Sequence, residues 1–558
     1  MSLVQASSDS VAPKAADEAA SPVPQPAPPP AVPMAGWKKP FYMAASVLLF
    51  VTQGLGMNLV NANIYQLQGS FSATAAEVSW LSAAYMAPYA SLSIALFKIR
   101  TQYGLRRFAE FSIVCFVFAA VLNLLVTDLH SAIVVRALSG IAAAPISTLG
   151  FLYMLELFPP ERKLTTGISL ALMCTLFAAP IARIISPPLL DLGGYHALYT
   201  LEMGLALLVF AIIYTMPLTS PPRAVVIQRL DFLSYLLLAV GFGCLAVVLT
   251  LGRLYWWFEA PWIGVLLAVA AGCLALVVAI ELPRENPMLD IRWVLSGPNL
   301  RMAGVLLMFR FVSSEQSSTA ANFYQQLGLL NDQTTKLYAI VLVASVLGGL
   351  FCTLLMTTRY VSTAHLISLV LIAAGAYLDS QSTSLTRPEQ MYLSQALVSA
   401  GAAMFLPPVM ASGFKAAMAR GYPFIVNFLA IFLFTQSIGS LFGSAMLGTF
   451  VTIREKFHSN VLVEHILLQD PLVAQRVSQL SAGYGKVITD QTLLNAEGLA
   501  LLSQQVTREA YTLAYNDTFL AICVASLLGL LVMLLHQAWL RLSERRTAEP
   551  NASAAVQS

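Results

Sequence analysis

The sequence predicts an all-α polytopic membrane protein with 14 transmembrane helices, and three observations predict it. The chain has 558 residues, of which 58% are hydrophobic and only 11% are charged, whereas a soluble domain carries about 25% charged residues. Its mean hydropathy is +0.72. Apolar stretches of roughly 20 residues, long enough to cross about 30 Å of hydrocarbon, recur along the chain. This composition excludes a water-soluble enzyme, and a formal net charge of only +3 speaks against binding of nucleic acid.

The elements follow in chain order. Residues 1–36 are rich in Ala, Pro and Ser and predict a disordered cytoplasmic tail. Apolar cores then predict fourteen spans, at 41–66, 78–97, 108–127, 131–157, 164–186, 197–216, 231–251, 261–281, 302–326, 335–356, 361–379, 389–413, 422–450 and 514–539. The long segment 454–513 is too polar to span a membrane. Its helical apolar spacing, interrupted at Asp470-Pro471 and Gly483-Tyr484-Gly485, predicts short amphipathic helices on the periplasmic side.

The distribution of Lys and Arg predicts the orientation of the chain in the membrane. If the N-terminal tail is inside, 20 of the 31 Lys and Arg residues lie in cytoplasmic segments, and only three lie in short outside loops. Because cytoplasmic loops carry the excess of positive charge, both termini are expected in the cytoplasm of a multi-pass inner-membrane protein.

No residue pattern points to a bound metal or cofactor. The six cysteines lie in apolar runs without CxxC spacing, the six histidines lie singly, and phosphate-binding loops are absent. We therefore expect no metal, no cofactor and no enzymatic activity; the lipid bilayer and a small molecule are the expected partners, and nucleic acid is not.

Several motifs, taken together, resemble those of one transporter family. They are Leu59-Val60-Asn61 with Gly69, Tyr103-Gly104-Leu105-Arg106-Arg107, Arg136 with Gly140 and Ala144, Phe158-Pro159-Pro160-Glu161-Arg162-Lys163, Ala179-Pro180-Ile181 and Asn286-Pro287-Met288-Leu289-Asp290-Ile291-Arg292. Across residues 41–540 the chain resembles the 14-span, EmrB-type branch of drug/proton antiporters in the major facilitator superfamily. It departs from that pattern at Gly56, Thr101 and Arg183, which replace an acid, an acid and a glycine respectively.

The resemblance implies a major facilitator fold, with two six-helix halves plus two inserted helices. The expected parts are the N-terminal half at 37–216, the insertion at 217–299, the C-terminal half at 300–540 with its periplasmic loop 454–513, and a cytoplasmic tail at 541–558. It also implies multidrug-type efflux of small amphipathic or anionic compounds, coupled to protons. The loop implies a periplasmic adaptor protein and an outer-membrane channel as partners. A siderophore transporter of the same fold and a non-transporting, receptor-like member are the alternatives.

Arginines within spans are the first candidates for the substrate pathway. A charge near the bilayer centre costs about 2.5 to 3.5 kcal/mol, so it must face the bundle interior or a wet cavity. Arg136 is expected in the pathway, with snorkelling as the alternative. Arg183 is expected either to pair with Glu202, because both lie in the periplasmic half of the membrane, or to contact an anionic substrate.

The span at 302–326 is the most polar one and is expected to line the pathway with Arg310, Gln316 and Asn322. Arg310 and Glu315 lie about 140° apart around a helix, so they should face different neighbours. Glu315, near mid-membrane, is the first candidate for a proton carrier, with a fixed ion pair as the alternative, and Glu202 is the second candidate.

Uncharged polar residues in the first span complete the set of candidates. Asn58 and Asn61 share a helix face at i, i+3. Their amides are expected to hydrogen-bond either a substrate or another helix.

Overall fold

The computed structural model describes residues 35–220, 223, 225–358, 361–467 and 469–556. Within these residues it is all-helical, and nearly all of the tail predicted at 1–36 lies outside them. The α-helices are α1 (Lys39–Ala62), α2 (Ile64–Phe71), α3 (Ala75–Tyr103), α4 (Leu105–Leu124), α5 (Leu129–Glu156), α6 (Pro160–Arg162), α7 (Ile168–Thr175), α8 (Ala178–Thr215), α9 (Arg229–Leu251), α10 (Pro261–Glu281), α11 (Ile291–Val294), α12 (Gly297–Ser314), α13 (Ala320–Gln326), α14 (Asn331–Met356), α15 (Val361–Asp379), α16 (Tyr392–Met418), α17 (Tyr422–Glu464), α18 (Pro471–Ser481) and α19 (Gln491–Val556).

The helices are consistent with the fourteen predicted spans. In the described part of the chain, 12 helical stretches are long and apolar enough to cross a membrane. One of them, Pro160–Thr215, holds two predicted spans, because the chain turns back at Gly193 and Gly194, where Gly194 has a φ of +57°. A further span is α12 to α13, which is interrupted by the π-helix Glu315–Thr319.

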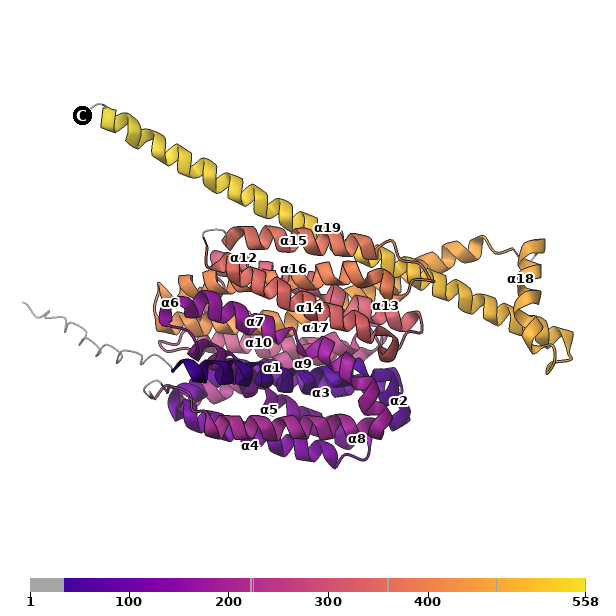
Figure 1. Cartoon of the computed structure of the whole chain (residues 1–558), viewed down its shortest axis with the longest axis horizontal. Coiled ribbons are helices and arrows are strands. Elements are labelled where there is room, and N and C mark those ends of the chain that lie inside the picture. Colours follow the sequence, from indigo (N-terminus) through magenta and orange to yellow (C-terminus); the bar gives the residue numbers. More distant parts are fainter. Residues whose placement is uncertain (1–34, 221–222, 224, 359–360, 468, 557–558) are drawn as a thin grey trace, which may run out of the picture.

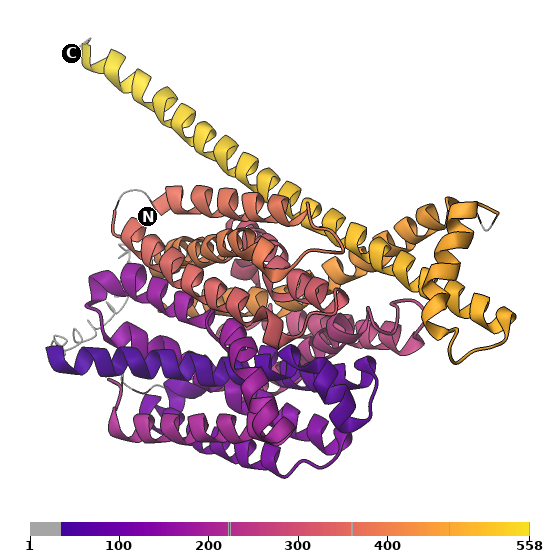
Figure 2. The same cartoon turned by 45° about the vertical axis from the view of Figure 1, so that its right-hand side comes forward.

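The spans form two halves with the inserted pair between them (Figure 1). Helices α1 to α8 make one half and α12 to α19 the other, while α9 packs against α3 and α17, one helix from each half. The halves also touch each other through α8 with α14, α3 with α17 and α7 with α14. We call the end of the bundle where α1 begins the N-terminal face, and the opposite end, from which α18 projects, the hairpin face (Figures 1 and 2).

Glycines let helices within each half approach closely. A Cβ atom on Gly140 of α5 would lie 2.1 Å from the Tyr85 backbone oxygen of α3, and one on Gly348 of α14 would lie 2.5 Å from the Ala400 oxygen of α16. The small residues that follow Arg136 along α5 therefore serve helix packing.

The segment 454–513 differs from the expectation of short helices. Helix α17 continues past its predicted span to Glu464, and α19 already begins at Gln491, so both membrane helices extend beyond the bundle (Figure 2). The physical reason is that the polar segment keeps a helical period, so the helices continue where the apolar composition ends. The expected interruptions are present: Asp470 accepts a hydrogen bond from the Leu472 N–H at the start of α18, and α18 ends at Ser481.

Candidate functional site

Two buried carboxyl groups and one amide meet in the C-terminal half. Glu315 begins the π-helix between α12 and α13, Asp379 is the last residue of α15, and Gln395 lies in the first turn of α16. The Gln395 Nε2 atom donates to Glu315 Oε1 at 2.9 Å and to Asp379 Oδ2 at 2.8 Å. Glu315 is 0% exposed, and Asp379 and Gln395 are each 1% exposed. We call these three residues the carboxyl site.

The π-helix brings two neighbouring side chains to the same partner. Gln316 Nε2 donates to the backbone oxygen of Gln395 at 3.1 Å, while Glu315 accepts from the side chain of Gln395. A π-helical turn is wider than an α-helical one and occurs frequently at functional sites. Gln316, predicted as a pathway residue, therefore helps to position the carboxyl site.

The outer oxygens of the two carboxyl groups make this a site for a proton. Glu315 Oε2 and Asp379 Oδ1 are enclosed and have no hydrogen-bond donor among the described residues. The two groups lie next to each other, because both accept a hydrogen bond from the same Gln395 Nε2 atom. Two ionised carboxylates buried side by side are costly, and a single proton between them removes the repulsion and supplies the missing donor. The geometry is therefore suited to taking up and releasing a proton.

A small pocket near the hairpin face lies between the two halves. Its lining includes Tyr324, Tyr338, Asn331 and Arg183, and thus residues of both halves. The hydroxyl groups of Tyr324 and Tyr338 have no hydrogen-bond partner among the described residues. Each of these hydroxyls can still donate or accept a hydrogen bond in the pocket.

Arg136 of α5 lies in the N-terminal half and faces an acid. It is 1% exposed, its Nη2 atom donates to the Gly56 backbone oxygen at 2.5 Å, and its guanidinium carbon lies 4.5 Å from the centre of the Tyr85 ring. Glu202 of α8, 3% exposed, lies close enough to interact with the charge of Arg136. A Cβ atom on Gly56 would lie 2.9 Å from Glu202 Oε1, so the glycine leaves space for this carboxyl group.

The predicted ion pair between Arg183 and Glu202 is wrong. Arg183 Nη1 donates to Asn331 Oδ1 of α14 at 3.1 Å, and its guanidinium carbon lies 5.1 Å from the centre of the Tyr338 ring. Equal depth in the membrane does not fix the direction of a side chain. The two side chains lie on different arms of α8, before and after the turn at Gly194, and face different neighbours: Arg183 bonds to Asn331 of α14, whereas Glu202 lies against Gly56 of α1.

Asn331 connects the two halves at the hairpin face. Its Nδ2 atom donates to the Ala62 backbone oxygen at 2.9 Å and to Asn63 Oδ1 at 3.1 Å, while its Oδ1 atom accepts from Arg183. Asn63 in turn donates to Ser186 Oγ at 2.7 Å. This buried polar cluster joins α14 of one half to the α1 end and α8 of the other, so the hairpin face is closed in this structure.

The remaining predicted residues have simple surroundings. Asn58 donates to the Gly54 oxygen of its own helix at 2.8 Å, and Asn61 accepts from Ser82 of α3 at 2.6 Å. Asn322 is half-buried in α13. Arg310 of α12 lies against Gly439 of α17, whereas Glu315 turns to Gln395 of α16, so the two face different neighbours as their spacing predicts.

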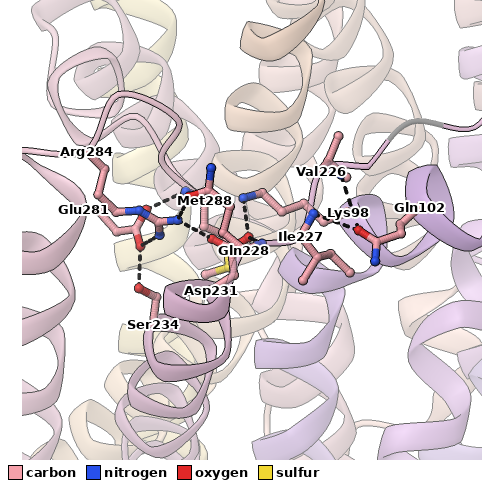
Figure 3. A network of polar contacts seen from close by, with 10 residues as sticks. All are labelled: Lys98, Gln102, Val226, Ile227, Gln228, Asp231, Ser234, Glu281, Arg284 and Met288. Carbon is pink, nitrogen blue, oxygen red and sulfur yellow. Dashed lines mark hydrogen bonds and ion pairs between the residues drawn. The ribbon is translucent and has the colours of Figure 1, made fainter.

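A charged network fastens the inserted helices to α3 at the N-terminal face (Figure 3). Asp231 of α9 accepts from Lys98 of α3 at 2.7 Å and from Arg284 at 2.8 Å, and Arg284 also pairs with Glu281 of α10 at 2.6 Å. Burial alone would lower the pKa of Arg284, but its hydrogen bonds to Asp231 and Glu281 raise the pKa above its ordinary value. Gln102, near the end of α3, accepts from the backbone N–H groups of Val226 and Ile227 before α9. The charges of two acids and two cations neutralise each other here, and these ion pairs offset the desolvation cost of burying them.

Sequence reasoning missed Asp379, Gln395 and this network. Asp379 ends an apolar span and reads as a loop residue, and Gln395 is a single amide in an otherwise apolar helix. The sequence does offer one signal for this site. Asp379 is a carboxyl group at the end of a span, and the span at 302–326 is unusually polar.

Comparisons with known proteins agree with this architecture. The sequence profile of the Major Facilitator Superfamily matches residues 46–444. The multidrug export protein EmrB of Haemophilus influenzae is 27% identical over 252 residues, or 45% of this chain and 48% of that protein, so the chain spans about half of that relative. The fatty acid resistance protein FarB of Neisseria gonorrhoeae is 21% identical over 86% of this chain and 94% of that protein. The solved structure of the proton:xylose symporter XylE is similar to this chain with a TM-score of 0.51 and 14% sequence identity, and the match covers 88% of this chain and 95% of that one. At this identity the similarity shows the fold alone.

Proposed function

The chain belongs to the Major Facilitator Superfamily, and from this membership we propose that it exports small amphipathic or anionic compounds across the inner membrane in exchange for protons. The two halves, which we assign to 37–216 and 300–540 with the inserted helices at 217–299, alternately expose a central path to either side. Both termini are placed in the cytoplasm, so the N-terminal face is the cytoplasmic one.

The carboxyl site is the observation that carries the proton coupling. An exchanger needs a titratable group that binds a proton on one side and releases it on the other. Glu315 and Asp379 share one amide donor and leave two oxygens that a proton would bridge. The pocket with Tyr324 supports proton entry from the hairpin face, and movement of α12 against α16 would separate Glu315 from Gln395 and release the proton inward.

The substrate class rests on the relatives and on the charges of the path. Relatives are named for multidrug export and for fatty acid resistance, and a fatty acid is an amphipathic anion. Arg136, Arg183 and Arg310 place positive charge within the spans of both halves, which supports a substrate that carries an anionic or strongly polar group.

Transport by Glu315→Gln tests the proposal. In inside-out vesicles with an acidic lumen, we expect the variant to lose pH-driven accumulation of an exported compound, because a neutral amide cannot carry a proton. Exchange of labelled for unlabelled compound without a pH gradient should persist, since it needs no net proton movement. Asp379→Asn should behave alike.

Glu110→Gln is the matched control, because Glu110 forms a partly exposed ion pair with Arg106 on α4 at the N-terminal face. If Glu315→Gln still accumulates the compound under a pH gradient, the carboxyl site does not couple transport to protons. Glu202, beside Arg136, is then the next acid to test.

An adaptor protein on the hairpin face is the second part of the proposal. The segment from the end of α17 to the start of α19, which includes α18, extends beyond the bundle and carries exposed apolar residues, among them Leu467, Leu472 and Val487. Exposed apolar surface of this kind needs a cover, and a periplasmic adaptor leading to an outer-membrane channel would supply one.

Cysteine labelling tests the orientation that this partner requires. Ser478 on α18 and Ser220 in the segment before α9 are both exposed. Single cysteines at these positions should react with an impermeant reagent from outside and from inside respectively, and the reverse pattern would contradict the proposed topology.

A further inference from the structure

Arg310 differs from the other arginines of the spans in having no partner. Arg136 bonds to the Gly56 oxygen and faces Glu202, and Arg183 bonds to Asn331. The Arg310 side chain makes no ion pair or hydrogen bond with any residue that the structure describes, and its Nε atom is enclosed. Because a charge inside the hydrocarbon region is costly without a counter-ion or water, this arginine calls for an anionic partner.

Two glycines place Arg310 against α17. A Cβ atom on Gly439 would lie 3.4 Å from Arg310 Cβ and Cγ, and one on Gly443 would lie 3.0 Å from the Arg310 backbone oxygen. Gln436 lies three residues before Gly439 and thus on the same face of α17, and its Nε2 atom is also enclosed without a partner. Side chains in a helix lean toward its N-terminus, which for both α12 and α17 is the N-terminal face, so Arg310 reaches toward the level of Gln436.

The opposite wall of this region is aromatic. Arg310 lies near Tyr89 of α3, which stacks on Tyr85 with ring centres 5.8 Å apart and an angle of 21°. Tyr85 in turn lies beneath Arg136. A row of two tyrosines thus runs from the arginine of one half toward the arginine of the other, with partly buried apolar side chains of both halves, such as Val51 and Leu342, packed around the core to which Tyr85 belongs.

The acids of the neighbouring spans face other polar groups and not Arg310. Glu315 turns to Gln395 and Asp379, and Glu202 lies beside Arg136. A cationic ligand would therefore meet an uncompensated guanidinium and an unpaired amide donor, whereas an anion would satisfy both.

We propose that Arg310, with the Gln436 amide, binds the carboxylate of an amphipathic substrate between the two halves, and that Tyr89 faces its apolar body. The inference rests on the proposed export function and narrows its substrates to small monocarboxylates with an apolar or aromatic body. Glu315 lies five residues further along the same helix, so the anion site and the proton site are carried by one element and can be moved together.

Binding of 2-naphthoate and of its neutral analogue 2-naphthamide to the purified full-length protein in nanodiscs tests the proposal. The wild-type protein should prefer the carboxylate. Arg310→Gln should weaken naphthoate binding roughly 10- to 100-fold, the range of a charge-assisted hydrogen bond, and leave naphthamide binding within about twofold. Arg310→Lys should retain part of the preference, which a loss through misfolding would not allow.

Arg301→Gln is the matched control, because Arg301 lies on the same helix α12 but is exposed at the N-terminal face. Equal naphthoate binding by the wild type and Arg310→Gln, or no saturable naphthoate binding by the wild type, would overturn the inference. The preference of Glu315→Gln for naphthoate over naphthamide should persist because Arg310 is unchanged, so a failure of the anion site and a failure of proton coupling give different results.

Discussion

Replacing Asn331 by alanine should open the hairpin face. The side chain of Asn331 makes hydrogen bonds of 2.9 Å and 3.1 Å to Ala62 and Asn63 and accepts one of 3.1 Å from Arg183. A neutral hydrogen bond contributes about 0.5 to 1.5 kcal/mol and one to a charged group about 1.5 to 3 kcal/mol. The three together favour the closed arrangement by at least about 2 kcal/mol, so their loss should shift the equilibrium toward the open arrangement roughly 30-fold or more.

Spin-label distances measure this shift. Ser70 on α2 and Gln381 after α15 are exposed residues of the two halves at the hairpin face, and cysteines placed there in a background without the six native cysteines carry the labels. The distance distribution of Asn331→Ala should move to longer values. Thr335→Ala is the control, because Thr335 bonds only to the Asn331 backbone oxygen in its own helix. An unchanged distribution, or the same shift in the control, would refute the assignment of Asn331 as the closing contact.

Three further predictions concern other parts of the molecule. Gly56→Ala should lower transport and the melting temperature, because the new Cβ lies 2.9 Å from Glu202 Oε1, and the additional change Glu202→Asp should restore part of both if this overlap is the cause. Asp231→Asn should destabilise the protein by on the order of 3 to 5 kcal/mol, since Lys98 and Arg284 lose their shared counter-ion, whereas the exposed Asp332→Asn should leave the melting temperature unchanged. Deleting residues 463–505 removes α18 but keeps the ion pair between Arg454 and Asp517 at 2.6 Å. Transport into vesicles should therefore persist, while resistance of whole cells should disappear. Equal loss in both assays would show that the loop is part of the transport machinery.

Particular residues explain how far the sequence could predict this structure. The membrane spans followed from apolar length alone, and the family resemblance supplied the two halves, because both depend on composition and local motifs. The partner of Arg183 did not follow, since the turn at Gly194 puts Glu202 on the other arm of α8 and Arg183 bonds to Asn331 of a distant helix instead. Asp379 was missed for the same reason: a carboxyl group at a span end becomes a site only when Glu315 and Gln395, 64 and 16 residues away, are brought to it. The continuous helices α17 and α19 were unexpected because a polar composition was read as the end of a helix.

Proton release on substrate binding tests the central claim most directly. A compound that the vesicle assay shows to be exported is added to the purified protein in weakly buffered solution with a pH indicator, at several values between about pH 5 and pH 9. The wild type should release about one proton per protein, because the carboxyl site holds one shared proton, and Glu315→Gln and Asp379→Asn should release none. Release of the same size from either variant, or no release by the wild type at any pH, would contradict the assignment of Glu315 and Asp379 as the proton carriers.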